Sequence, residues 1–101
     1  MLKDNLELLE ELLLDVNGLL ISLRVGDGLN KEKVNQVYKV LTDLAAGWKG
    51  QEKIPKKAVD LFIDIYPGML SSSDYYSHEV AIEIMDCCDK IIDLIKDCIS
   101  Y

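Results

Sequence analysis

Apolar residues recur every three or four positions along most of the chain, which is the spacing of one face of an α-helix. The first such segment begins after Asp4, an acidic residue that can cap a helix N-terminus, and continues to about Arg24. Its leucines cover a wider arc than one stripe requires, as in a helix packed against several neighbours. The pair Asn17-Gly18 interrupts the segment and is a point where the helix can kink.

Three further segments have the same spacing. A second helix is predicted over residues 30–48, where Asn30 can serve as the N-cap. A short third helix is predicted to end at Pro67, because proline removes a backbone hydrogen bond and clashes with the preceding turn. Its apolar positions are Ala58, Val59, Phe62, Ile65 and Tyr66. The fourth helix, over about 75–99, has an apolar stripe formed by Val80, Ala81, Ile84, Met85, Cys88, Ile91, Ile92, Ile95, Cys98 and Ile99.

No segment alternates polar and apolar residues with a period of two for more than a few positions, so no strand is expected. Four helices with short connections predict an all-α fold, an antiparallel four-helix bundle with a short third helix. A chain of 101 residues is long enough for one hydrophobic core, so residues 1–101 are expected to form a single helical domain.

Composition excludes several classes of protein. Hydrophobic residues make up 50% of the chain, which is too many for a disordered acidic tail. The net charge of −7 would repel nucleic acid and anionic membranes, so neither is expected as a partner. No apolar run is long enough to span a bilayer, and the acidic N-terminal region does not resemble a signal peptide. We therefore expect a cytoplasmic protein.

The negative charge is not evenly distributed. Residues 1–57 contain nine acidic and nine basic side chains, whereas residues 58–101 contain nine acidic side chains and only Lys90 and Lys96 as bases. In the fourth predicted helix, five acids lie opposite the isoleucine stripe: Glu79, Glu83, Asp86, Asp93 and Asp97. Like charges at this spacing destabilise a helix slightly. The row is therefore either a solvated face or a docking surface for a basic protein.

The sequence contains no recognisable catalytic or ligand-binding motif. A single histidine, His78, excludes a two-histidine metal site, and no glycine-rich phosphate loop or nucleophile motif occurs. A general acid needs a carboxylate whose pKa is raised by an apolar pocket, and the carboxylates of this chain are expected on polar faces instead. We therefore expect no enzyme activity, no catalytic, cofactor-binding or metal-binding residues, and no cofactor.

The three cysteines are Cys87, Cys88 and Cys98. An odd number cannot form a complete set of disulfides, and reduced thiols suit a reducing compartment. Cys88 and Cys98 belong to the apolar stripe and are expected in the core. A metal or redox pair at Cys87-Cys88 is the alternative, although neighbouring residues on a helix point about 100° apart.

Aromatic residues outside the core are candidates for protein recognition, since they combine a large contact area with a polar group. Tyr75 and Tyr76 follow Asp74, and adjacent residues cannot both face the core, so at least one is expected to be exposed. Trp48 and Tyr66 are expected to close the core at helix ends.

The segment Asp64-Ile65-Tyr66-Pro67, together with Asp74-Tyr75-Tyr76, resembles a motif of bacterial toxin-immunity proteins. These are the helical partners of nuclease colicins and of contact-dependent growth inhibition toxins. The resemblance implies a cytoplasmic inhibitor that binds a basic toxin, a nuclease, and covers its active-site groove with acidic side chains. It also implies a protein that is monomeric when free or heterodimeric with its toxin. The candidate partner-binding residues are Asp64, Asp74, Tyr75, Tyr76, Glu79, Glu83, Asp86 and Asp93.

Two alternatives remain open. The segment Gly47-Trp48-Lys49-Gly50 is similar to the mid-chain turn of the WXG100 group of small secreted helical proteins, and Tyr75 with Glu79 is similar to that group's secretion signal. The third interpretation is a structural helical adaptor that binds an amphipathic helix and forms homodimers through an exposed apolar groove.

Overall fold

The computed structural model describes residues 4–100, and this part of the chain contains helices and no strands. The all-helical class predicted from the sequence is confirmed. The five helices of the described range are α1 (Asn5–Leu14), α2 (Leu19–Arg24), α3 (Lys31–Trp48), α4 (Lys56–Ser73) and α5 (His78–Ile99).

Side-chain caps fix where three of the helices begin. The Oδ1 atom of Asp4 accepts a hydrogen bond from the backbone N–H of Glu7 at 2.8 Å, and Asn30 accepts one from Lys33 at 3.1 Å. Both predicted N-caps are thereby confirmed. The last helix begins a few residues later than predicted, because its cap is Ser77, the residue just before α5. Each cap satisfies a backbone donor that the first helical turn leaves without a partner.

The first predicted helix is divided into α1 and α2, which is more than the expected kink. The break lies at residues 15–18, and Gly18 is the N-cap of α2. A Cβ atom at Gly18 would lie 2.6 Å from the backbone C and O atoms of Leu13, so only glycine fits this close approach. The chain therefore turns sharply at this glycine and packs α2 against the end of α1.

The prediction of a short third helix is wrong. Helix α4 continues through Pro67 to Ser73 and, at 18 residues, is as long as α3. Pro67 lies on the exposed side of the helix, so water can reach the carbonyl group that lacks its N–H partner. Ile65 and Met69, on either side of the proline, are completely buried, and this burial offsets the lost hydrogen bond.

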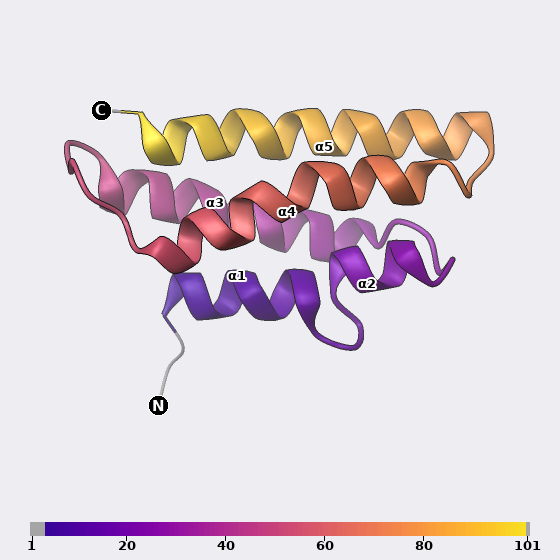
Figure 1. The fold of residues 1–101 in the computed structure, drawn as a ribbon, viewed down its shortest axis with the longest axis horizontal. Coiled ribbons are helices and arrows are strands. Elements are labelled where there is room, and N and C mark those ends of the chain that lie inside the picture. Colours follow the sequence, from indigo (N-terminus) through magenta and orange to yellow (C-terminus); the bar gives the residue numbers. More distant parts are fainter. Residues whose placement is uncertain (1–3, 101) are drawn as a thin grey trace.

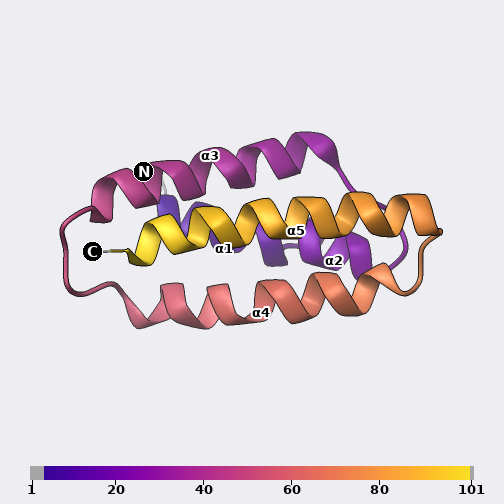
Figure 2. The ribbon, with the colours of Figure 1, turned by 90° about the horizontal axis from the view of Figure 1, so that it is seen from above.

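The helices form a bundle with α3 and α4 between α5 on one side and α1 and α2 on the other (Figure 1). Seen from above, α5 lies between α3 and α4 (Figure 2). Helix α5 packs against both α3 and α4, whereas α1 packs against α3 and α2 packs against α4. Helices α3 and α5 run in the same direction and α4 runs opposite to them (Figure 1).

All five helices contribute to one hydrophobic core. The large side chains with almost no exposed surface are Leu9, Leu13, Leu19, Leu23, Val37, Leu41, Ile65, Met69, Ile84, Cys88 and Ile91. Burying each such side chain contributes about 1.5–3 kcal/mol to folding. The expectation that Cys88 and Cys98 are core residues is confirmed. None of the described helices is long and apolar enough to cross a lipid bilayer.

The two aromatic residues expected to close the core behave differently. Trp48 is half-buried, and its ring meets the edge of Phe62 with 6.4 Å between ring centres. Tyr66 is 44% exposed, so the expectation that it closes the core is wrong. In α4, Ile65 and Met69 occupy the inner positions, and Tyr66 lies about 100° round the helix from Ile65, at the edge of the buried side.

Candidate protein-binding surfaces

The first candidate surface is a row of carboxylates on the outer side of α5, named here the acidic face. The inward positions Ile84, Cys88 and Ile91 are completely buried, and this sets the rotation of the helix. The five residues of the acidic face, all exposed, are Glu79, Glu83, Asp86, Asp93 and Asp97. They span about 27 Å at the 1.5 Å rise per residue of an α-helix. Within residues 4–100, none of these carboxylates forms an ion pair with another side chain.

Lys90 interrupts the acidic face and is held on the α3 side of it. Its ammonium nitrogen lies 4.5 Å from the centre of the Tyr38 ring, a cation–π contact. Burial, together with the neighbouring Cys87 thiol, raises the pKa of Tyr38 well above its usual value. Glu83, Asp86 and Lys90 thus border a shallow hollow between α3 and α5.

Asp64 and Tyr75 lie elsewhere, beside a hollow between α2 and α4. This hollow also contains Arg24, Pro67 and Gly68. Because α2 packs on α4 and α3 packs on α5, the two hollows belong to different sides of the bundle. The candidate residues predicted from the sequence therefore do not form one continuous surface.

The two adjacent tyrosines have different environments. Tyr75 is 75% exposed, so the prediction that at least one of the pair is exposed is confirmed. The hydroxyl of Tyr76 donates a hydrogen bond to the carbonyl of Leu23 at 2.7 Å and accepts one from the N–H of Gly28 at 3.1 Å. Tyr76 thus connects the turn before α5 to the end of α2. The neighbouring Asp74 is exposed at the C-terminal end of α4.

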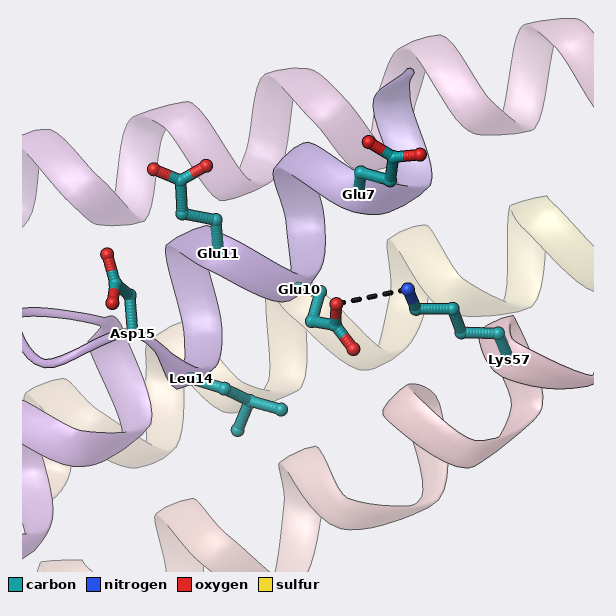
Figure 3. A pocket seen from close by; sticks show the side chains of 6 residues that line it. All are labelled: Glu7, Glu10, Glu11, Leu14, Asp15 and Lys57. Carbon is teal, nitrogen blue, oxygen red and sulfur yellow. Dashed lines mark ion pairs between the residues drawn. The ribbon is translucent and has the colours of Figure 1, made fainter. Parts of the chain in front are cut away.

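The charge count by halves did not reveal a second acidic surface, on α1. Glu7, Glu10, Glu11, Leu14 and Asp15 line an open hollow together with Lys57 of α4 (Figure 3). Lys57 Nζ lies 3.0 Å from Glu10 Oε1, and this contact raises the pKa of Lys57. Most bases of the first half follow residue 30, so the half is neutral in sum although α1 itself is acidic. The spacing of the acids along α1 is the sequence signal that could have indicated this face.

Another surface missed from the sequence is apolar. Four residues of α4 form an exposed row, named here the α4 apolar row: Val59 (46% exposed), Ile63 (63%), Tyr66 (44%) and Leu70 (42%). Their spacings of four, three and four residues place them on one side of the helix, beside the buried side. The single apolar stripe predicted for this segment places Val59 and Tyr66 with the inward residues. The signal it did not use was the presence of two apolar rows, rather than one, in residues 56–73.

All three cysteines are buried thiols. Burial raises the pKa of Cys88 and of Cys98 to about 11, and it also raises the pKa of Cys87. The thiol of Cys98 donates a hydrogen bond to the carbonyl oxygen of Leu41 at 3.3 Å. These groups remain protonated at neutral pH, and the thiolate is the form that reacts and binds metals. Among residues 4–100, no three His, Cys, Asp or Glu side chains are placed to hold a metal ion together.

Comparisons with protein families, with curated proteins and with solved structures find no match to this chain. Its function is therefore argued from its surfaces alone.

Proposed function

We propose that this protein is an immunity protein, an antitoxin-like inhibitor that binds a basic toxin in the cytoplasm and neutralises it. The observation that supports this proposal best is the acidic face of α5, an exposed row of carboxylates without ion pairs to other described residues. A row of like charges along one helix costs stability. A partner of opposite charge provides a reason for keeping it.

The proposed mechanism is electrostatic and steric. A nuclease holds the phosphates of RNA or DNA in a cationic groove, and a rigid row of carboxylates about 27 Å long can occupy such a groove. Complementary charge accelerates association and selects the partner. The core residues beneath the acidic face fix its geometry before binding, so little conformational entropy is lost when the complex forms.

We assign the contact to Glu79, Glu83, Asp86 and Asp93, with one inhibitor bound to one toxin. Tyr75 and Asp64 border the hollow on the other side of the bundle, and Asp74 lies at the end of α4. These three contribute only if the toxin extends around that end of the bundle. Tyr76 contributes through the fold, because its hydroxyl is engaged by Leu23 and Gly28.

The test uses the product of the neighbouring gene as the candidate toxin, because immunity genes usually lie beside the genes of their toxins. We expect the triple variant Glu83→Lys, Asp86→Lys, Asp93→Lys to lose at least about 100-fold in affinity, since like charges would then face each other across the contact. The matched control reverses three exposed acids away from α5, namely Glu7, Asp15 and Asp43. The control has the same net charge, so it should change affinity only through long-range attraction.

An equal loss of affinity in both triple variants would show that net charge alone matters and would contradict the assignment to α5. Failure of the unmodified protein to bind the neighbouring toxin domain or to inhibit it would contradict the function itself.

A structural adaptor is the second candidate, and the α4 apolar row is the observation that favours it. An adaptor would bind an apolar helix and tolerate reversal of the acidic face. The same triple variant therefore separates the two functions. A WXG100-like protein is less compatible with this chain, because the breaks at 15–18 and 49–55 leave no pair of long unbroken helices.

A further inference from the structure

The α4 apolar row differs from the other exposed apolar residues in its arrangement. Scattered apolar side chains are normal on a protein surface, and Val16 and Val25 in the loops are examples. The row instead presents four large side chains along three turns of one helix. A contiguous apolar strip of this kind marks an interaction site.

The adjoining side of α5 extends this strip. Cys87 and Cys98 contact Tyr38 and Leu41 of α3, which identifies the side of α5 that faces α3. Met85, Ile92 and Ile99 lie on the other side of α5, the side toward α4. Of these, Ile99 is 57% exposed. A stable interface removes about 800 Å² from each partner, which is more than four half-exposed side chains supply, so both helices are needed.

We propose that the α4 apolar row binds a second copy of this chain, giving a two-fold symmetric dimer in which the two α4 helices pack antiparallel. The row has the spacing of coiled-coil contact positions. Its order of spacings, four, three and four, is the same in both directions along the helix. A two-fold axis midway between Ile63 and Tyr66 therefore places Val59 opposite the partner's Leu70, and Ile63 opposite the partner's Tyr66.

The charges beside the row fit the same pairing. Lys56, in the first turn of α4, and Asp74, its C-cap, are both exposed. They are 18 residues apart, which is about five helical turns, so both flank the row on the same side. In the antiparallel pair, Lys56 of each copy lies near the partner's Asp74. The dimer thus gains two symmetric ion pairs, and a parallel pair would instead bring like charges together.

This dimer is independent of the proposed inhibitory function. The acidic face of α5 and the apolar side of α5 occupy different parts of the helix circumference, so each copy retains its acidic face for a toxin. The resemblance to immunity proteins implies a free monomer, and the α4 apolar row is the reason to propose a dimer instead.

The first experiment measures the mass of the full chain in solution by sedimentation equilibrium over a concentration series. We expect the unmodified protein to reach twice 11.4 kDa, and Ile63→Glu to remain at 11.4 kDa. Val25→Glu is the matched control, because Val25 is equally exposed at 63% but lies in a loop, and it should still dimerise. Circular dichroism verifies that both variants keep their helices.

A mass of 11.4 kDa for the unmodified protein throughout the series would overturn the proposal, as would a dimer that Ile63→Glu leaves intact. If Ile63→Glu abolished binding of the toxin domain while the free protein was monomeric, the row would belong to the toxin contact, and the dimer would again be excluded.

The second experiment tests the pairing by exchanging charges. Lys56→Glu and Asp74→Lys should each weaken dimerisation about tenfold, and the double variant should regain most of the loss because the ion pairs form again with reversed polarity. A double variant as weak as the sum of the two single changes would exclude the antiparallel arrangement.

Discussion

The outer faces of α4 and α5 have opposite character, although the two helices pack side by side and run in opposite directions (Figure 1). Helix α5 is amphipathic in the ordinary way, with isoleucines and cysteines inward and carboxylates outward. Helix α4 has two neighbouring apolar rows, one buried with Ile65 and Met69 and one exposed with Ile63 and Tyr66. Core formation accounts for most apolar positions of α5, where Ile82 and Ile99 stay exposed, whereas four large apolar side chains of α4 stay exposed in one row.

This difference indicates which of the two surfaces needs a binding partner to explain it. Carboxylates in water keep the protein soluble whether or not they bind anything, so the acidic face is compatible with either role. Exposed isoleucine and leucine in a continuous row do not stabilise the monomer. The α4 apolar row is therefore the feature whose explanation requires a partner.

The largest effect is expected at the inner faces, where the two helices are alike. Met69→Ala in α4 and Ile91→Ala in α5 should each lower the free energy of unfolding by about 2–5 kcal/mol, because each leaves a cavity in a fully buried site. Urea denaturation at low protein concentration measures this loss. Ile63→Ala, on the outer face, should change it by less than about 0.5 kcal/mol. Equal losses at positions 63 and 69 would mean that the orientation of α4 is wrong.

The turn between the two helices should depend on one tyrosine of the adjacent pair. Tyr76→Phe removes the hydroxyl that bonds Leu23 and Gly28, and we expect a loss of about 1–3 kcal/mol in unfolding free energy. Tyr75→Phe is the control and should have no measurable effect, since Tyr75 is largely exposed. The same denaturation experiment compares them, and similar losses would contradict the role given to Tyr76.

Alkaline pH should destabilise the inner face of α5 more than that of α4, because the thiols lie on α5. The pKa of Cys88 and of Cys98 rises from 9.0 to about 11 on folding, so between these values the unfolded chain has released protons that the folded protein retains. Unfolding is then favoured as the pH increases. Residual hydration of the thiols reduces this effect, and we expect a fall of about 1 kcal/mol between pH 9 and 11.

The control for this pH dependence is the double variant Cys88→Ala, Cys98→Ala, in which the decrease should be smaller. If the unfolding free energy of the variant fell as much between pH 9 and 11 as that of the unmodified protein, groups other than these two thiols would be responsible.

The smallest effect concerns the single base within the acidic face. Lys90→Gln should cost about 0.5 kcal/mol, because it removes the cation above the Tyr38 ring. Lys96→Gln removes the same charge from an exposed position of α5 and is the comparison. A larger loss for Lys96→Gln, measured by thermal unfolding, would show that general charge balance outweighs the ring contact.

Local signals in the sequence predicted much of the fold. The caps at Asp4 and Asn30 are confirmed because they depend on residues within three positions of each other. The buried side of α5 was also predicted, since one clear apolar stripe leaves a single way to rotate the helix. The prediction of a short third helix was wrong because it used only the local cost of a proline inside a helix, about 3 kcal/mol. Burial of several residues beyond Pro67 opposes this cost, and it cannot be read from local sequence.

The candidate surfaces were predicted less completely. The acidic face follows from the spacing of its residues along α5 alone. Its separation from Asp64 and Tyr75 does not, because it depends on which helices are neighbours in space. The α4 apolar row was missed for a similar reason, since helical spacing cannot tell which of two apolar sides faces the core.

The sequence by itself determined the helical class, the caps and the composition of each helix face, because these depend on residues a few positions apart. Only the tertiary structure decided that α4 extends to Ser73, that Tyr76 bonds to the end of α2, and that Ile63 and Tyr66 face outward. These outcomes depend on contacts between segments that are distant in the chain. The same packing of α4 against α2 and α5 buries one of its apolar sides and leaves the other available to a partner.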